Sequence, residues 1–266
     1  MLTLLCALAA GIIVGLGTIY GFHLTPSWGT FFGVLALLIV QVTVSLIVRR
    51  RTTKINLQIQ GIMLEVQKKL ESKQQQFMRR PLDPKLMMQQ FTKEQNAGLE
   101  RAIEACELFR PLYKWSFLME RQINTMKMQL YFQLRDFART DQLLPKCLLM
   151  DARSIAIKLV RMYRNEDPKL DSFYRKKCRR AKGEDGAFLA CVYAWIKLRQ
   201  DDPAKAIAAL VEAKKNSDNP ALIANYENLA NNRPKHFSNA AFGDNWYALY
   251  LEEPKVRPQK VQQRMY

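Results

Sequence analysis

The first 48 residues contain no Lys, Arg, Asp or Glu. Apart from a polar turn at residues 23–27, this segment is apolar, and it is much longer than the core helix of a soluble protein. A helix needs about 20 apolar residues to cross the hydrocarbon of a bilayer. The sequence therefore predicts a transmembrane hairpin over 1–48, with crossings at about 2–20 and 31–48.

The uncharged segment is closed by a run of basic residues. These residues set the expected topology, and they are Arg49, Arg50, Arg51 and Lys54. Because basic residues next to a membrane helix favour the cytoplasmic side, both termini and the soluble part are expected in the cytoplasm, and the chain is expected in an inner or plasma membrane.

The chain is also poor in the residues that build metal sites and disulfide frameworks. Its five cysteines are widely spaced without a C-x-x-C pair, and it has only two histidines. This pattern predicts no zinc site and is typical of a reducing compartment. No nucleophile elbow, P-loop, H-E-x-x-H or dinucleotide-binding glycine motif is present, so we expect no enzyme, no catalytic residue and no cofactor.

All 41 basic and all 24 acidic residues follow the hairpin, so this part alone carries the formal charge of +17. Such a charge beside a bilayer attracts anionic headgroups, by ~1 kcal/mol for each basic residue near the surface. It also allows an acidic protein or a nucleic acid as partner.

Residues 49–80 are predicted to form a basic juxtamembrane helix, or stalk. An apolar stripe recurs along it at spacings of three and four, at Ile55, Ile59, Ile62, Val66 and Leu70. The stripe either packs against the following domain or the membrane surface, or pairs two copies of the chain in a coiled coil. Small residues at Gly11, Gly15, Gly17 and Gly21 allow close helix approach, either within the hairpin or between copies.

The segment 81–253 shows helical periodicity and almost no strand pattern. Two prolines at its start break the stalk. Helices are expected near 86–109, 112–137, 141–164, 168–181, 186–200, 203–215 and 219–230. The fold class is therefore all-α, with the Asp-Pro pairs at 167–168 and 202–203 as candidate helix starts. The tail 254–266 lacks apolar periodicity and is expected to be disordered.

A 34-residue unit beginning at residue 187 resembles a tetratricopeptide repeat, and a unit from residue 121 is similar. Small residues stand where the two helices of a hairpin would approach, and larger ones where hairpins would meet. The candidate packing residues are Tyr131, Phe137, Leu144, Cys147, Tyr163, Tyr193, Ala194, Ala206, Leu210 and Ala213. A generic array of helical hairpins remains the alternative.

This resemblance implies a curved repeat array whose concave face binds peptides or proteins. Together with the two-crossing anchor, the layout is similar to that of the bacterial HemY family. We carry no haem chemistry over from that layout.

Two further groups of residues are candidates for binding a partner or lipid. Ten basic and three acidic residues lie in 158–182; the candidates among them are Arg175, Lys176, Lys177, Arg179 and Arg180. Either this run is a solvated face, or it meets lipid phosphates, an acidic partner or RNA. An aromatic C-terminal stretch holds Trp246 and Tyr250, which either cap the last hairpin or bind a partner.

These patterns together predict a membrane-anchored, non-catalytic adaptor that binds a protein partner. One alternative is a membrane-tethered protein that binds RNA or anionic lipid through its basic patch. A second is an accessory subunit of a transport or assembly complex, for which the polar residues of the second crossing, Gln41, Thr43 and Ser45, would be the starting point. A homodimer is compatible with each.

Overall fold

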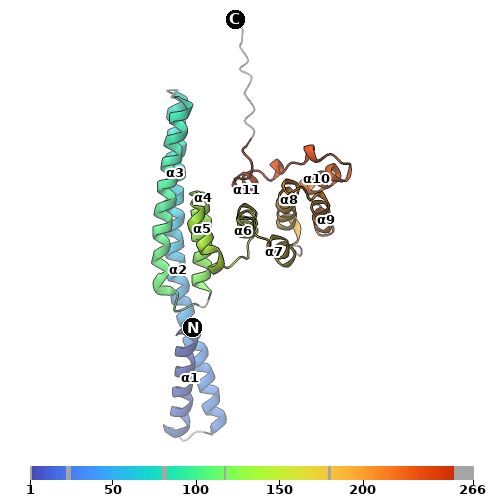
Figure 1. Ribbon diagram of the computed structural model, residues 1–266. Coiled ribbons are helices and arrows are strands. Elements are labelled where there is room, and N and C mark those ends of the chain that lie inside the picture. The colour runs from blue at the N-terminus through green and yellow to red at the C-terminus, as the bar shows by residue number, and fades with distance from the viewer. Residues whose placement is uncertain (1, 22–24, 80–82, 117, 179–180, 255–266) are drawn as a thin grey trace. The chain divides into compact units, whose positions relative to one another are not determined.

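The computed structural model describes residues 2–21, 25–79, 83–116, 118–178 and 181–254. Within these ranges the chain is helical and contains no strand (Figure 1). The chain divides into two units, Met1–Leu148 and Leu149–Tyr266, each of which is described by itself.

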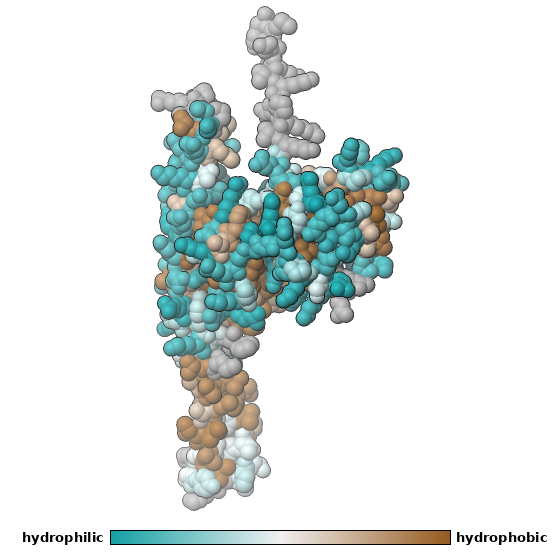
Figure 2. Space-filling model, viewed as in Figure 1, coloured by the Kyte–Doolittle hydropathy of each residue, from teal (hydrophilic) through white to brown (hydrophobic). Residues whose placement is uncertain are grey.

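The first unit begins with two helices that are long and apolar enough to cross a membrane. They are α1 (Leu2–Gly21) and α2 (Pro26–Arg79), of which the first half of α2 is apolar. Few of these apolar residues are buried within the protein, and most of the large ones are exposed. Figure 2 shows the resulting hydrophobic surface as a continuous brown zone. A core helix of a soluble protein would hide such residues, so the two helices have the exposed apolar surface that is typical of membrane-crossing segments.

Backbone contact between glycines holds α1 against α2. A Cβ atom on Gly33 would lie 2.8 Å from the carbonyl oxygen of Gly11, and one on Gly15 would lie 3.2 Å from that of Gly29. Two small-xxx-small pairs therefore face each other within the hairpin. By contrast, a Cβ on Gly17 or on Gly21 would meet nothing within 4 Å.

The second crossing and the predicted stalk form one unbroken helix. α2 has 54 residues, which corresponds to about 80 Å at 1.5 Å per residue. No proline lies inside it, and Gly61 is tolerated in an exposed position. The boundary expected at 48/49 is thus a change of side-chain polarity without any change of backbone.

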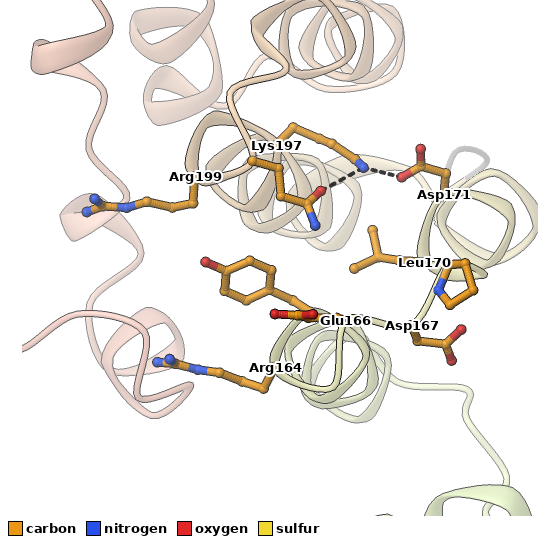
Figure 3. A pocket seen from close by; sticks show the side chains of 10 residues that line it. Arg164, Glu166, Asp167, Leu170, Asp171, Lys197 and Arg199 are labelled. Carbon is orange, nitrogen blue, oxygen red and sulfur yellow. Dashed lines mark hydrogen bonds and ion pairs between the residues drawn. The ribbon is translucent and has the colours of Figure 1, made fainter.

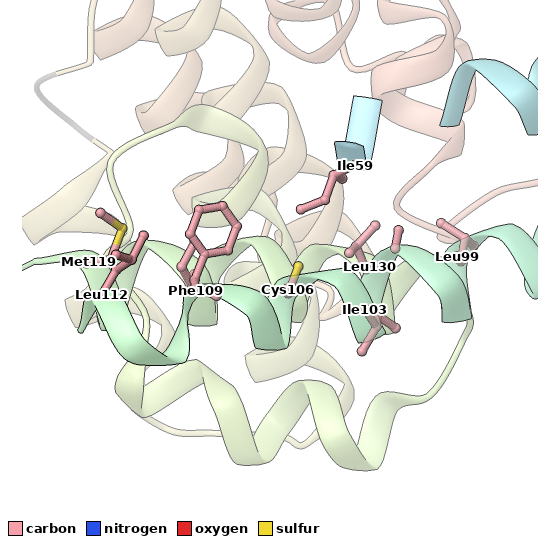
Figure 4. Close-up of a cluster of buried hydrophobic side chains, with 10 residues drawn as sticks. Ile59, Leu99, Ile103, Cys106, Phe109, Leu112, Met119 and Leu130 are labelled. Atoms are coloured by element: carbon pink, nitrogen blue, oxygen red, sulfur yellow. The ribbon is translucent and has the colours of Figure 1, made fainter. Parts of the chain in front are cut away.

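The apolar stripe of the stalk packs against α3 (Pro84–Cys106), as the first of the two interpretations predicts. Ile59 lies in one core cluster with Leu99 and Phe109, and Ile55 packs against its edge (Figure 4). Ion pairs flank this seam, from Lys73 Nζ to Glu94 Oε1 at 2.7 Å and from Arg101 Nη2 to Glu65 Oε2 at 2.8 Å. The Glu65 pKa falls to about 2 because of the hydrogen bonds from Arg101 and Lys69.

The rest of the first unit differs from the predicted helices. A 3-10 helix, η1 (Glu107–Leu112), and a loop precede α4 (Met119–Gln133), so the helix expected at 112–137 starts late. The helix expected at 141–164 is wrong. In its place are α5 (Phe137–Leu143), η2 (Leu144–Lys146), an extended turn and, already in the second unit, α6 (Ala152–Arg164). Pro145 and the N-cap Asp151, whose side chain accepts from the Ser154 N–H, account for this break.

The second unit continues from α6 with further helices. These are α7 (Leu170–Lys177), α8 (Gly183–Arg199), α9 (Pro203–Lys214) and α10 (Pro220–Ala230), followed by η3 (Pro234–His236), η4 (Ala240–Phe242) and α11 (Asp244–Tyr247). The predicted start at Asp202-Pro203 is confirmed, since the Asp202 side chain caps α9. The start at Asp167-Pro168 is two residues early, because α7 begins at Leu170.

Helices α4, α6, α8 and α10 end in the same turn. A non-glycine residue with positive φ follows each helix, at Arg135, Glu166, Asp201 and Asn232, which lie 31, 35 and 31 residues apart. At each site the next N–H donates to the carbonyl five residues earlier, over 2.7 to 2.9 Å. This is the Schellman pattern of a helix C-terminus. The chain thus repeats one local element at nearly constant intervals.

The tight contact of α2 with α3 gives a test of the first unit. A Cβ on Gly98 would lie 2.2 Å from Val66 Cγ2, so Gly98→Ala should overpack the seam and lower the free energy of unfolding by about 1–2 kcal/mol. Gly61→Ala is the matched control, because nothing lies within 4 Å of its Cβ and alanine favours helix by about 0.5–1 kcal/mol. Urea unfolding of the full chain in detergent, followed by circular dichroism, measures both. Equal effects would contradict the packing described.

Candidate ligand groove

The long helix α8 is the centre of the second unit. Its residues from Gly186 to Lys197 are all buried. This explains why the segment is apolar on every side and lacks the one-sided pattern of a surface helix. The C-terminal end of α8 and its C-cap Gln200 reach an open space.

That space is a cavity of about 650 Å³, bounded by the end of α6, the loop before α7 and the end of α8. Figure 3 shows its side chains converging from these three segments. The lining is Tyr163, Arg164, Glu166, Asp167, Pro168, Leu170, Asp171, Lys197, Arg199 and Gln200. Polar and charged groups therefore form most of the wall, and the volume lies in the range of ligand pockets.

An ion pair between the buried Lys197 and the half-buried Asp171 forms the floor of the cavity. The Lys197 side chain is 7% exposed, forms an ion pair with Asp171 and donates to Gln200 Oε1 at 2.9 Å (Figure 3). Asp171 also accepts from the Tyr193 hydroxyl at 3.0 Å, and Lys205 Nζ lies 3.1 Å from its other oxygen. Three donors from α8 and α9 thus hold one carboxylate of α7.

The titration of this cluster follows from its contacts. Burial alone would raise the pKa of Asp171, but the hydrogen bonds from Lys197, Lys205 and Tyr193 outweigh it, so the pKa falls below its ordinary value. Burial and the adjacent Asp171 raise the pKa of the Tyr193 hydroxyl, which remains a donor. The ring of Tyr193 stacks on Tyr174 with centroids 3.8 Å apart, which fixes its direction.

Two arginines stand at the rim of the cavity. Arg199 lies over the Trp195 ring at 5.0 Å and Arg164 beside the Tyr163 ring at 6.0 Å. Neither makes an ion pair within the described ranges, and both are exposed. The aromatic rings hold the two guanidinium groups in place, and leave their N–H groups available to a ligand.

Carboxylates occupy the loop between the arginines and the floor. Glu166 is exposed and has φ 52°, a conformation that places its side chain beside the cavity (Figure 3). Asp167 is half-buried and caps the following turn, accepting from the Lys169 N–H at 2.8 Å. The cavity therefore offers both signs of charge within one small volume.

A second hollow, of about 430 Å³, meets the first at Asp171. It is lined by Asp171, Tyr174, Arg175, Tyr193, Lys205, Ala208, Ala209 and Glu212. Of the predicted basic patch, only Arg175 lies here. Lys176 and Lys177 are exposed on α7, and Arg179 and Arg180 lie outside the described residues. The two hollows together are called the groove below.

Aromatic residues close the second unit. Trp246 is fully buried, and its indole N–H and that of Trp195 both donate to Glu252, at 3.1 and 2.7 Å. Trp246 is therefore a core residue, and its predicted role in binding a partner is wrong. The capping interpretation describes it better. Tyr250 is half-buried, with φ 54°.

The candidate packing residues fall in both units. Ala194, Ala206, Leu210 and Ala213 lie in one buried cluster between α8 and α9. Tyr193 is buried against α7, and Tyr163 is half-buried beside Trp195. In the first unit, Leu144 and Cys147 are buried, whereas Tyr131 and Phe137 are half-buried.

The sequence interpretation named Tyr163, Tyr193 and Arg175 of the groove but missed its charged centre and rim. Asp171, Lys197, Arg164 and Arg199 come from three helices and share no motif. One signal was available, because Lys197 interrupts an otherwise apolar helix and so needs a buried partner.

The described cysteines show no sign of reactivity. None of the five described cysteines forms a disulfide, and burial raises the pKa of Cys106 to about 11 and those of Cys178 and Cys191 to about 12. Within the described residues, no three His, Cys, Asp or Glu side chains are grouped to hold a metal.

Removal of the Asp171 charge tests the floor of the groove. Asp171→Asn leaves Lys197 buried without a counter-charge and should lower the free energy of unfolding by about 3 kcal/mol. Asp202→Asn is the matched control, because Asp202 also contacts Lys205, at 2.9 Å, but lies outside the cavity and asparagine is an equally good cap. Its expected effect is under about 1 kcal/mol. Urea unfolding followed by tryptophan fluorescence measures both.

The same pair predicts a dependence on acid pH. Because the pKa of Asp171 is lower in the folded state than its ordinary 3.8, the pair stabilises the fold above that value and loses its effect as pH falls through the folded pKa. The difference in stability between wild type and Asp171→Asn should therefore shrink below about pH 4. A constant difference from pH 7 to pH 3 would contradict this.

Comparison of the chain with protein-family models, with curated proteins and with solved structures finds no match. The groove is accordingly interpreted from its geometry. Its side chains can recognise a ligand by charge and hydrogen bonding, and they do not combine into a nucleophile with its base.

Proposed function

We propose that this chain is a membrane-anchored adaptor, in which α1 and the first half of α2 span a bilayer and the groove of the second unit binds a segment of a partner protein. The observation that carries the proposal is the groove itself, a polar cavity with two unpaired arginines over a fixed carboxylate floor. Catalysis plays no part in it.

Membrane insertion is supported by the exposed apolar surface of the hairpin and by its glycine contacts. The basic run 49–54 follows directly, so by the positive-inside rule we expect the second unit, and the part of the first unit after residue 48, on the cytoplasmic side. The repeated helix-ending turn supports an array of helical hairpins like the tetratricopeptide repeats, which bind peptides along one face.

The charges in the groove favour a peptide with an acidic side chain. Arg164 and Arg199 can each form a two-point contact with a carboxylate, whereas Glu166 and Asp167 can accept from backbone N–H groups of the ligand. A continuous polyanion such as RNA would meet the three carboxylates of the cavity at close range, and like charges repel. RNA or lipid binding through the exposed Lys176 and Lys177 remains the second candidate.

Two double variants separate these candidates. Arg164→Glu/Arg199→Glu alters the groove, whereas Lys176→Glu/Lys177→Glu alters the patch by the same formal charge. The intact protein in mild detergent is used as bait, and co-purified proteins are quantified by mass spectrometry. The groove variant should lose its specific partners by about tenfold or more, and the patch variant should retain them.

The opposite pattern would favour the patch, and retention by both variants would refute the groove. Circular dichroism of each variant checks that the helices are intact. Nuclease treatment before the pull-down shows whether RNA bridges any loss.

Membrane topology is tested with vesicles of known sidedness. The full chain should remain with the membrane after alkaline extraction, because about 20 apolar residues in each crossing are buried in lipid. A protease should digest the second unit only when the cytoplasmic face is accessible. Release by alkali, or digestion from the opposite face, would contradict the proposed anchor.

A further inference from the structure

A cavity lies in the first unit at the end of the apolar hairpin, where α1 begins and α2 becomes polar. It has a volume of about 770 Å³, and its wall is largely apolar. The lining is Thr3, Leu4, Leu5, Gln41, Ser45, Val48, Arg49, Thr52, Trp115, Ser116 and Met119. No carboxylate is among these residues, so the cavity differs in chemistry from the groove.

A loop from the polar side forms the third wall of this cavity. The Leu2 N–H donates to the Lys114 carbonyl at 3.1 Å, and the Thr3 hydroxyl donates to that of Trp115 at 3.2 Å. Met119 and Leu112, on either side of the loop, are buried in the core of the unit (Figure 4). The cavity is thus enclosed by α1, by α2 and by a loop that is hydrogen-bonded to α1 and anchored in the core at both ends.

Two polar atoms in this region are buried and lack a partner. They are Gln41 Oε1 and Thr52 Oγ1, which are the unsatisfied buried side-chain atoms within the described residues. In an apolar surrounding a polar atom without a hydrogen bond is costly, so each of the two side chains calls for a partner that the described residues do not supply. Both belong to residues that line the cavity.

The polar residues follow one face of α2 in order of depth. Gln41, Ser45 and Arg49 are one turn apart, about 6 Å each, and Thr52 lies nearly a turn further out. If the apolar stretch spans the bilayer, Gln41 lies in hydrocarbon, Arg49 at its boundary and Thr52 among the headgroups. Arg49 makes no ion pair among the described residues and is exposed at the cavity mouth.

We propose that this cavity binds one anionic glycerophospholipid of the cytoplasmic leaflet. Arg49 and Thr52 contact its phosphate, Ser45 donates to an ester carbonyl, and Leu4, Leu5 and Val48 contact the upper part of an acyl chain. If the Gln41 side-chain amide is rotated by about 180°, its NH₂ group faces the same ester region and can donate to it. The indole of Trp115 lies at the headgroup level, where such rings are favoured.

The composition of the wall supports a lipid over other occupants. Every polar side chain of the wall can donate a hydrogen bond, which matches a ligand whose phosphate and ester oxygens only accept. The apolar residues exclude a soluble anion as the whole ligand, because they would remain against water. This inference rests on the proposed membrane insertion.

The test uses the full chain in a mild detergent, with phosphatidylglycerol, phosphatidylcholine or inorganic phosphate added. Native mass spectrometry counts the molecules that remain bound. The pocket variant is Arg49→Gln/Thr52→Val, and the control is Arg50→Gln/Thr53→Val. The control shifts the same two changes by one residue, to exposed positions outside the cavity.

Wild type and control should retain one phosphatidylglycerol, with at least tenfold weaker binding in the pocket variant and for phosphatidylcholine. Inorganic phosphate should not compete. Equal loss in both variants would show that the basic run attracts lipid without a site, and equal retention would exclude the cavity. Competition by phosphate would assign the site to a soluble anion.

This experiment distinguishes a failure of the proposed membrane anchor from a failure of the proposed lipid site. Alkaline extraction of the same variants reports insertion, which all of them should keep. Retention in the membrane without lipid selectivity would overturn the lipid site alone, whereas release of the wild type would overturn the anchor and the lipid site with it.

Discussion

The first unit depends on α2, a single continuous helix whose first half is apolar and whose second half is charged. α2 has an apolar half, whose large side chains are mostly exposed, and a charged half, which forms ion pairs with α3, and its backbone continues through the change at Arg49. Since a helix satisfies its own hydrogen bonds, it can cross such a boundary without a break. In the membrane-anchored arrangement proposed above, side-chain polarity alone sets the depth of α1, α3 and the loop at Trp115.

The two halves of α2 are held by different forces. In the apolar half, glycines bring the backbones of α1 and α2 into contact, which is the packing typical of helices that associate in lipid. In the polar half, Ile59 and Val66 are removed from water by α3, and ion pairs such as Arg101–Glu65 border the seam. The cavity proposed to hold a lipid lies between the glycine contacts of the apolar half and the α2–α3 seam of the polar half. At this transition neither kind of packing fills the space completely.

The second unit concentrates its polar chemistry around one buried charge. Lys197 cannot leave the core without exposing α8, so Asp171, Gln200 and Tyr193 are arranged around it. This fixed network gives the groove a rigid floor, while Arg164 and Arg199 at the rim remain available. A rigid floor and free rim charges are suited to recognition, since little side-chain entropy is lost on binding.

The sequence by itself determined the helical class, the apolar hairpin and the α8–α9 hairpin, because these depend on local periodicity and on residues such as Asp202-Pro203. Pro145 and Asp151 also indicated the break after α5, but the apolar residues on either side keep a helical spacing, which favoured one continuous helix. Only the tertiary structure decided that the stalk packs on α3, that Trp246 is a core residue, and that Asp171, Lys197 and the two arginines meet. Such contacts join residues far apart in the chain, and without a fold no spacing rule connects them.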